Sequence, residues 1–186
     1  MSHSPAVRRD AVRNHERLLV AARAVFAEQG QSASLHEVAR RAGMGVGTIY
    51  RNYPTKEALL DAVVADGLTA LASQVLELPE GSTPARAFAD ALELVLQAQL
   101  ADRALGDGPP GPRSTAQIAT VVAAVDELLR DAQAAGAVRA DVTTADLVAL
   151  VRAVGDASRT APDRSRLLLH VVLHGLHRDA APPAGE

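Results

Sequence analysis

The stretch RRAGMGVGTIYRNYPTKEALL, residues 40–60, holds three glycines in five positions, Gly43, Gly45 and Gly47, followed by both tyrosines and the only lysine of the chain. Glycine is costly inside a helix, yet the residues on either side have helical spacing. Such a stretch is typical of two short helices joined by a tight turn, in which Gly43 adopts the left-handed conformation. The stretch therefore predicts a helix-turn-helix.

The residues around Gly43 have the character that such packing requires. Apolar side chains stand where the two helices meet, and a small one stands where they cross; these are Val38, Ala39, Ala42, Met44 and Ile49. The pattern therefore predicts that the helix before the turn and the helix after it pack against each other through these residues.

Both helices have recognisable starts. Ser34 and Glu37 have the spacing of a capping box, and Gly45 stands where the second helix, expected over 46–52, begins. Gly47, one turn in, has no side chain, so the backbone there is able to approach a groove wall or a phosphate closely. We interpret the glycines as forming the turn and also as allowing the backbone to approach a surface outside the protein.

Polar groups in the same stretch suit a surface lined with phosphates. Thr48, Tyr50 and Tyr53 supply hydroxyls, and Arg51 and Lys56 supply positive charge. Lys56 is expected in the first turn of its helix, where the macrodipole disfavours a cation, so an outside anion is the better partner for it. The stretch favours binding to a polyanion.

Charge is divided unevenly along the chain. Residues 1–60 carry nine Lys or Arg against five Asp or Glu, whereas residues 61–186 carry ten against seventeen. This asymmetry favours an N-terminal part that meets nucleic acid and a remainder that does not. Arg8, Arg9 and Arg13 form a basic arm that contacts phosphates, enters the minor groove or is simply solvated.

Composition narrows the remaining possibilities. A chain of 186 residues is long enough to bury a core, and the absence of cysteine excludes disulfides, thiolate catalysis and sulfur-ligated zinc. We expect no signal peptide, because no apolar run follows the N-terminal charges, and no membrane span. A cytoplasmic protein is expected.

Helical periodicity runs through nearly the whole chain, which predicts an all-α fold. Breaks at Gly30, Gly43, 79–84, 105–112 and Gly136 separate the elements. The helices are expected over 10–29, from Ser34 to the turn, and over 46–52, 54–75, 84–102, 114–135, 143–158 and 163–178.

The order and spacing of residues 10–60 make the resemblance specific. Gln29-Gly30, then Ser34-x-x-Glu37-Val-Ala39, then Ala42-Gly-Met-Gly-Val-Gly-Thr-Ile-Tyr-Arg-Asn-Tyr-Pro-Thr-Lys-Glu57-Ala-Leu59 resemble the DNA-binding domain of the TetR family of transcriptional regulators. The resemblance implies a three-helix DNA-binding head joined to a larger helical domain for ligand binding and dimerisation.

The resemblance also implies roles for individual residues. Ser34, Thr48, Tyr50 and Lys56 correspond to residues that hold the DNA backbone, whereas Val46 and Gly47, with Tyr50, correspond to positions near base edges. The family commonly has serine at position 45, so Gly45 forfeits a cap and a hydrogen bond. Arg51 stands where an aromatic residue is frequent, and reaches either a phosphate or a guanine. Direct readout by Val46 is limited to apolar contact, which leaves more of the specificity to Arg51 and DNA shape.

For the rest of the chain the resemblance implies a homodimer and an effector pocket. The last two helices would form the dimer interface, through Leu150, Val154, Leu168, Val171, Val172 and Gly175. The middle helices would enclose the effector, through Leu71, Val75, Leu92, Leu96, Gln99, Ile118 and Val122. Most of these residues fit an ordinary core equally well. The scarcity of aromatic residues favours an aliphatic or small amphipathic effector.

The resulting hypothesis is a DNA-binding transcriptional regulator with four segments. These are a basic flexible arm (1–9), a helix-turn-helix domain (10–56), a helical effector-binding and dimerisation domain (57–179) and a disordered tail (180–186). A repressor released from a palindromic operator is favoured; an activator, or a DNA-binding protein without an effector, is the alternative. An all-α enzyme has little support, because no nucleophile–base or phosphate-loop motif is present.

No cofactor is expected. His170, His174 and His177 have spacing that suits a metal ion, but no carboxylate on their helix completes a ligand set, so we predict no metal site.

Overall fold

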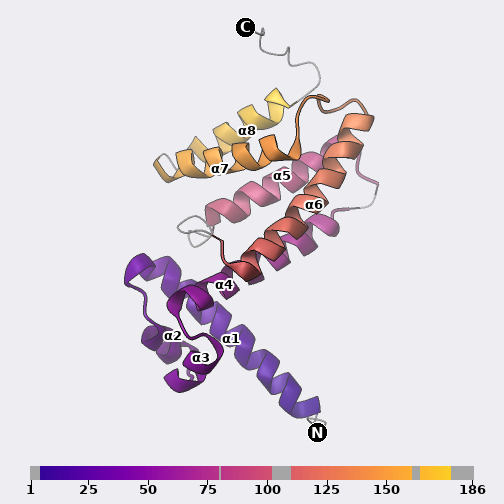
Figure 1. Cartoon of the computed structure of the whole chain (residues 1–186). Helices are drawn as coiled ribbons and strands as arrows, with labels where there is room; N and C mark the ends of the chain where they lie inside the picture. The colour runs from indigo at the N-terminus through magenta and orange to yellow at the C-terminus, as the bar shows by residue number, and fades with distance from the viewer. Residues whose placement is uncertain (1–4, 80, 102–109, 161–163, 177–186) are drawn as a thin grey trace. The chain divides into compact units, whose positions relative to one another are not determined.

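The computed structural model describes residues 5–79, 81–101, 110–160 and 164–176, and within these ranges the chain is helical without a strand (Figure 1). The all-α prediction is therefore confirmed. The helices are α1 (Pro5–Gln29), α2 (Leu35–Ala42), α3 (Val46–Asn52), α4 (Lys56–Leu76), α5 (Pro84–Ala101), α6 (Pro112–Ala134), α7 (Thr144–Thr160) and α8 (Ser165–Gly175), with a 3-10 turn at Gly30–Ser32.

Most helix ends agree with the expected ones, and the start of α1 differs most. It begins at Pro5 rather than near residue 10, so residues 5–9 are helical instead of forming part of a flexible arm. Proline is favoured at the first helical position, and the alanine and arginines that follow are good helix formers. The expected tail, 180–186, and most of the expected loop, 105–112, lie outside the described residues.

The chain divides into two compact units. The first, here called the head, consists of Met1–Gly67 and Arg103–Ala116, and the second, here called the helical body, consists of Leu68–Asp102 and Gln117–Glu186. This division differs from the expected boundary between residues 56 and 57, because the first turns of α4 pack into the head through Leu59 and Val63, both fully buried.

The head has a core of its own, formed where α1, α2, α3 and the start of α4 meet. Its centre consists of aliphatic side chains at most 1% exposed, among them Leu18, Val25, Val38 and Ile49. The apolar positions expected on both sides of the turn, Val38, Ala39, Ala42 and Ile49, are buried, and Met44 packs against them. α2 therefore packs directly against α1, and α3 packs against α2.

A carboxylate of α4 fixes the start of α6 within the head. Asp61 accepts hydrogen bonds from the backbone N–H groups of Arg113 (3.0 Å) and Ser114 (3.0 Å) and from the Ser114 hydroxyl (2.6 Å). Asp61 therefore acts as an N-cap supplied from another helix, satisfying donors that α6 leaves unpaired. Gly111 permits this approach, because a Cβ there would lie 2.4 Å from the Asp61 Cγ atom.

In the helical body, α5, α7 and α8 pack on one another. α7 starts with a reciprocal cap, in which Thr143 N–H donates to Asp146 (2.8 Å) and Asp146 N–H donates to the Thr143 hydroxyl (3.3 Å). Farther along, Gly155 faces Gln99 so closely that a Cβ on the glycine would lie 2.6 Å from the Gln99 Nε2 atom. A glycine therefore allows α7 to approach the Gln99 side chain of α5.

α4 is long and apolar enough, by length and composition alone, to cross a membrane, with a mean hydropathy of 1.5 over its best window. One such helix is weak evidence for a membrane span, because core helices pass the same test. The apolar side chains Leu59, Val63, Leu71 and Val75 of α4 are at most 5% exposed, and 39% of the apolar window is buried.

Candidate nucleic-acid interface

The turn between α2 and α3 has the predicted conformation. Gly43 lies in the left-handed region (φ 63°, ψ 37°), and the next N–H, of Met44, donates to the Ala39 carbonyl (3.0 Å). This is the usual way in which a glycine closes a helix. The prediction that Gly43 forms the turn is confirmed.

Arg17 of α1 supports the turn from behind, a role that the sequence analysis missed. Its Nη2 atom donates to the Ala42 carbonyl (2.8 Å), and a Cβ at position 43 would lie 3.2 Å from the same atom. A cation at the C-terminal end of α2 is also favourable for the helix dipole. The contact joins residues 25 positions apart, so no local pattern signals it.

α3 has one buried side and one open side. Gly45 is its N-cap (φ −67°, ψ 132°) without a side-chain hydrogen bond, as expected for a glycine, and Ile49 is fully buried. Gly47, Tyr50 and Arg51 are exposed, and Val46 and Thr48 are half-buried. Gly47, Tyr50 and Arg51 therefore share the side of α3 that the head core leaves open, whereas Val46 packs partly against that core.

No contact within the described part of the molecule requires a glycine at position 47. Its backbone is helical, and a Cβ placed there would meet no atom within 4 Å among the described residues. Gly47 is the second residue of α3, so it carries at most the roughly 0.5–1 kcal/mol that glycine costs in a helix interior relative to alanine. Its presence here favours close approach by something outside the chain.

Tyr50 stands beside a histidine of α2. Its side chain is 44% exposed, and its ring meets His36 edge to face with 6.2 Å between centroids. His36 is exposed as well, and it extends the open surface from α3 onto α2. His36 was not among the residues predicted from the sequence, although its position two residues after the Ser34 cap was a usable signal.

Arg51 lies along its own helix. Its Nε atom donates to the Gly47 carbonyl (3.1 Å) and its Nη2 atom to the Thr48 hydroxyl (3.4 Å). This exposed side chain therefore rests beside two other predicted contact residues, where a short rotation brings it to an incoming anion.

Ser34 and Lys56 occupy the starts of α2 and α4. The Ser34 hydroxyl accepts the Glu37 N–H (3.2 Å), which is the predicted N-cap, and Ser34 remains exposed. Lys56 is the first residue of α4 and is half-buried, and the cap there comes from Thr55, whose hydroxyl accepts the Ala58 N–H (3.1 Å).

Tyr53 does not offer its hydroxyl to a surface, which corrects the sequence interpretation. It is only 4% exposed; its hydroxyl lies 3.5 Å from His15 Nδ1, and the guanidinium of Arg113 lies 5.3 Å from the ring centre. Burial raises the pKa of Tyr53, against the opposing effect of Arg113. Tyr53 instead links α1, the end of α3 and the start of α6.

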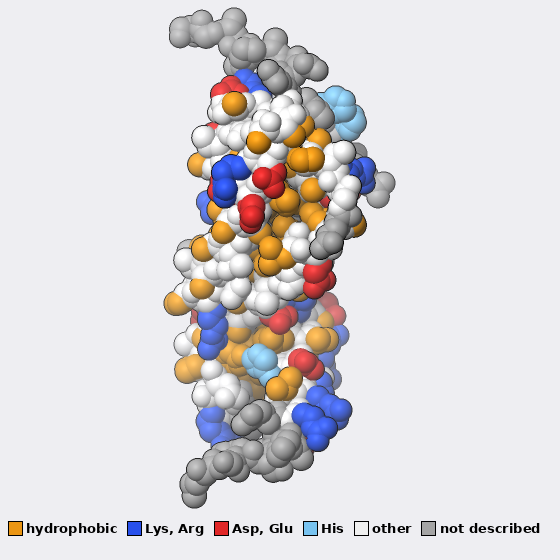
Figure 2. All heavy atoms as spheres, turned by 90° about the vertical axis from the view of Figure 1, so that its right-hand side faces the viewer, with side chains coloured by type: hydrophobic (Ala, Val, Ile, Leu, Met, Phe, Trp, Pro, Cys, Tyr) orange, Lys and Arg blue, Asp and Glu red, His pale blue; other side chains and the backbone are white. Residues whose placement is uncertain are grey.

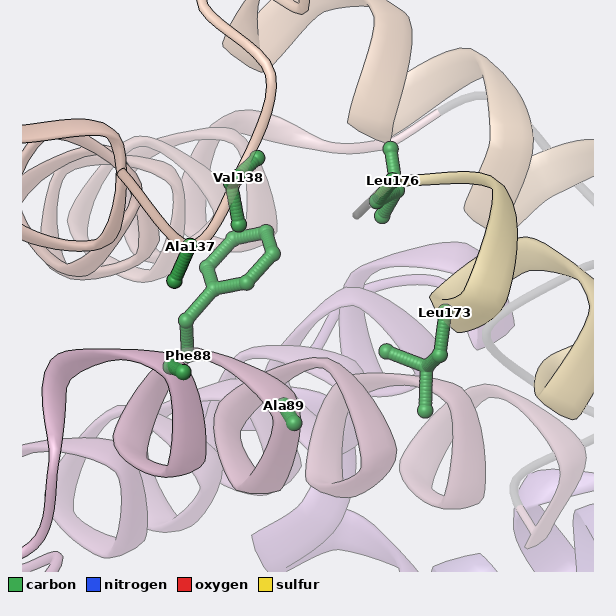
Figure 3. Close-up of a pocket in the computed structure, with 7 residues that line it drawn as sticks. Phe88, Ala89, Ala137, Val138, Leu173 and Leu176 are labelled. Carbon is green, nitrogen blue, oxygen red and sulfur yellow. The ribbon is translucent and has the colours of Figure 1, made fainter. Parts of the chain in front are cut away.

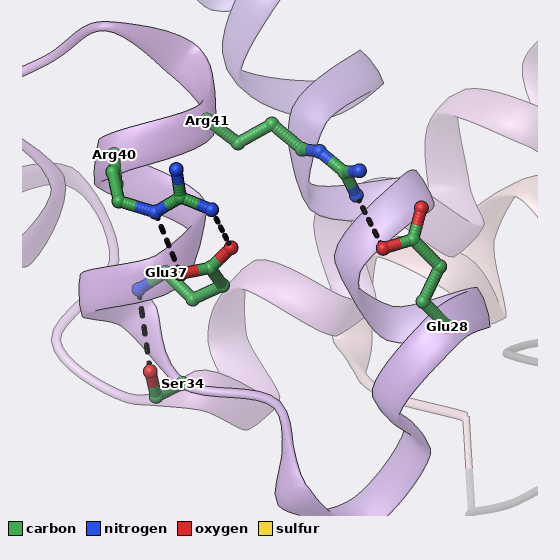
Figure 4. A network of polar contacts seen from close by, with 5 residues as sticks. All are labelled: Glu28, Ser34, Glu37, Arg40 and Arg41. Atoms are coloured by element: carbon green, nitrogen blue, oxygen red, sulfur yellow. Dashed lines mark hydrogen bonds and ion pairs between the residues drawn. The ribbon is translucent and has the colours of Figure 1, made fainter.

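The arginines of α2 are neutralised within the head (Figure 4). Arg40 is paired with Glu37 (2.5 Å) and Arg41 with Glu28 (2.7 Å). The hydrogen bond from Arg40 lowers the pKa of the Glu37 carboxyl most, although its slight desolvation acts in the opposite sense. Glu37 thus serves Arg40 rather than completing the capping box with Ser34.

Comparison with known proteins identifies the family to which this helix-turn-helix head and helical body belong. Residues 18–63 match the model for bacterial regulatory proteins of the tetR family, and residues 69–178 match the C-terminal domain of SbtR-like transcriptional regulators. The chain belongs to the TetR family. TetR-family proteins are soluble, DNA-binding transcriptional regulators and not enzymes, typically repressors that respond to small-molecule effectors.

Individual TetR-family relatives agree. The transcriptional regulator UidR of Escherichia coli is 27% identical over 139 residues, which cover 69% of this chain and 71% of UidR. A TetR transcriptional regulator of Streptomyces coelicolor is 31% identical with a TM-score of 0.68, covering 89% of this chain and 99% of that chain. One of Mycobacterium vanbaalenii is 33% identical with a TM-score of 0.68, covering 92% and 99%.

Among other TetR-fold structures, FadR of Bacillus subtilis was solved in complex with stearoyl-CoA and RolR with resorcinol, at 16% and 20% identity and TM-scores of 0.68 and 0.66. The FadR match covers 88% of this chain and 100% of the FadR chain, and the RolR match covers 96% of this chain and 98% of the RolR chain. At these identities the likeness shows the fold alone.

The residues predicted to line an effector pocket lie in the interior of the helical body or at its margin. Leu71, Val75, Leu92 and Leu96 are buried, whereas Gln99, Ile118 and Val122 are half-buried. A cavity of about 30 Å³, enough for a water molecule or two, opens elsewhere in the body, beside Phe88 (Figure 3). Its lining consists of Ala85, Phe88, Ala89, Ala137, Val138, Leu173 and Leu176.

The residues predicted at the dimer interface range from buried to exposed. Val154 is buried, Leu150, Leu168 and Val172 are half-buried, and Val171 and Gly175 are exposed. Val171 is 59% exposed, and its α8 neighbour Leu167 is 49% exposed. Two large aliphatic side chains one turn apart therefore face outward from α8.

The histidines of α8 form a close pair. The rings of His170 and His174 lie 4.3 Å apart between centroids, and both are exposed. His177 lies outside the described residues, and within the described ranges no group of three or more candidate metal ligands occurs.

Proposed function

We propose that this TetR-family regulator is a cytoplasmic homodimer that inserts α3 into the major groove of a palindromic operator and is released by a small effector. The open side of α3 carries the proposal, because it combines a glycine in the first turn, which no contact within the head requires, with the exposed side chains of Tyr50 and Arg51. An α-helix fits the major groove, and bare backbone at Gly47 lets it approach the groove wall.

The contacts divide into two kinds. Ser34, Thr48, Tyr50 and Lys56 hold the phosphate backbone through hydroxyl and ammonium groups, with the N-termini of α2 and α3 adding dipoles. Gly45, Val46 and Gly47 bring the first turn of α3 to the base edges, where Val46 offers apolar contact to a thymine methyl group. Arg51 is the one charged side chain of α3, and it is exposed.

Dimerisation is supported by the outward aliphatic residues of α8. Leu167 and Val171 expose apolar surface next to the half-buried Leu168 and Val172, and such a face is favourably covered by a second copy. A two-fold dimer reads two half-sites, which supplies the affinity that one short helix lacks. Light scattering should give twice the 19.4 kDa mass of the chain.

The effector is proposed to bind in the helical body among Leu71, Val75, Leu92, Leu96, Gln99, Ile118 and Val122. The aliphatic character of this set favours an aliphatic or small amphipathic molecule, with Gln99 as its polar anchor. Because the interior there is already packed, binding requires the helices to separate, which gives the effector a means of changing the protein's conformation.

The test is selection of genomic DNA fragments by the purified protein, followed by footprinting. An inverted repeat bound tightly at physiological salt supports the proposal, and equal weak binding to every fragment contradicts it. Metabolites that raise the melting temperature and release the selected fragment identify the effector. A promoter fusion then separates repression from activation, since deletion of the gene raises expression in the first case only.

Arg51→Ala is expected to lower the affinity for the selected operator about 10-fold or more, and to lower the affinity for unrelated duplexes by less. The reason is that a guanidinium on a base edge contributes about 1–3 kcal/mol of discrimination. Anisotropy titrations against both duplexes measure the difference. Equal losses on both would assign Arg51 to the phosphates instead.

A further inference from the structure

The first turns of α1 extend beyond the part of the helix that packs in the head (Figure 1). Residues 9–17 are all exposed, and the buried face of α1 begins only at Leu18. His15, stacked on Tyr53, and Arg17, bonded to the Ala42 carbonyl, join the end of this stretch to the rest of the head. A short helix without packing is marginal in water, so residues 9–14 gain little from the rest of the protein. The role of this extension has to come from its own surface.

That surface carries three arginines in register. Arg9, Arg13 and Arg17 are four residues apart, which places them along one side of α1 over about 12 Å at 1.5 Å per residue. Like charges at this spacing repel, and the first turn of α1 contains no acidic residue to offset the dipole. Asp10 and Glu16, each three residues from Arg13, offset part of this repulsion.

Other arginines of the head have partners within it. Arg23 is paired with Asp66 (3.7 Å), Arg113 lies over the Tyr53 ring, and Arg17 donates to the Ala42 carbonyl at the helix-turn-helix. In the described part of the chain, Arg9 and Arg13 have no ion-pair partner. Figure 2 shows Lys and Arg side chains gathered at the lower end of the head on the face in view.

We infer that Arg9 and Arg13, here called the α1 stripe, bind the phosphates of duplex DNA next to the groove that α3 occupies. Arg17, one turn farther along α1, contacts the turn between α2 and α3, so the stripe continues the proposed interface. A helix about 10–12 Å wide does not itself enter a minor groove about 6 Å wide, so the stripe is placed over the phosphates that border the groove. The inference rests on the proposed function.

The test is the salt dependence of binding by the full-length protein to a fluorescein-labelled duplex of random sequence. Each phosphate contact contributes about 0.9 to the slope of log affinity against log salt. Arg9→Gln with Arg13→Gln should make the slope less negative by about 1.8 per bound chain. The affinity ratio of wild type to variant should then shrink about tenfold between about 50 and 200 mM salt.

Matched variants separate this role from a structural one. Arg9→Lys with Arg13→Lys keeps the charges and should restore the wild-type slope, whereas Arg86→Gln removes a charge from the helical body and should leave the slope unchanged. A wild-type slope in the glutamine variant overturns the inference and leaves the proposed function intact. Failure of the wild-type protein to bind any duplex at low salt contradicts the proposed function itself.

Discussion

Asp61→Ala is expected to lower the free energy of unfolding by about 2–4 kcal/mol, measured by urea denaturation. The carboxylate accepts three hydrogen bonds at the start of α6, and hydrogen bonds to a charged acceptor contribute about 1.5–3 kcal/mol each. The total is smaller than their sum, because water can replace the acceptor at the exposed Arg113 N–H. Ser114 is only 1% exposed, so water cannot easily replace the lost acceptor there. Asp61→Asn should cost less, because its amide still accepts through one oxygen.

The same contribution has a defined pH dependence. Burial acts to raise the pKa of Asp61, but the hydrogen bonds from Ser114 and Arg113 and the Arg113 charge together hold it below 3.8. A lowered folded-state pKa means that the stabilisation is present above pH 3.8 and is lost as the pH falls through the folded-state value. The stability difference between wild type and Asp61→Ala should therefore be constant near neutrality and shrink in acid.

Gly111→Ala tests whether the contact between position 111 and the Asp61 carboxylate determines the stability of this region. In the wild type its Cβ would collide with the Asp61 carboxyl group, so the variant should be strongly destabilised. In the Asp61→Ala background that collision is removed, and the added cost should be small. Additive losses in the double variant would show that the two residues act independently.

Gly47→Ala should move stability and DNA binding in opposite directions. The position is helical with open space around it, so alanine should stabilise the head by about 0.5–1 kcal/mol. At the groove wall the new methyl group should cost about 1–3 kcal/mol of binding, a loss of roughly 10–100-fold in operator affinity. Thermal unfolding and anisotropy titrations on one preparation measure both effects.

Gly45→Ser is the matched comparison. Serine at this N-cap supplies the missing hydrogen-bond acceptor and meets only an ordinary contact, 3.9 Å from the Thr48 hydroxyl. It should stabilise α3 slightly without lowering the affinity for the operator. If both variants lose affinity equally, stiffening of α3 rather than clearance at Gly47 is responsible.

The helix-turn-helix could be predicted because local residues determine it. The left-handed turn at Gly43, the cap at Ser34 and the bounds of α3 each depend on side chains within a few positions. Spacing and residue type therefore carried enough information.

Long-range contacts could not be predicted in this way. From the sequence, Tyr53 has the character of a surface hydroxyl, but residues of α1 and α6 that are distant in the chain pack against it. Asp61 likewise accepts hydrogen bonds from donors 52 and 53 residues away. In the helical body, aliphatic side chains that would line a pocket have the same character as those that fill a core. Composition alone does not separate Leu92 from Val122, although one is buried and the other half-buried.

The contrast between the two tyrosines has a spectroscopic consequence. The chain contains no tryptophan, and Tyr50 and Tyr53 are its only tyrosines. All intrinsic ultraviolet emission above the phenylalanine background therefore originates in the head, one fluorophore accessible to an aqueous quencher and the other shielded. Iodide quenching of the unlabelled protein thus reports directly on whether a docked duplex covers Tyr50, with Tyr53 as an internal reference.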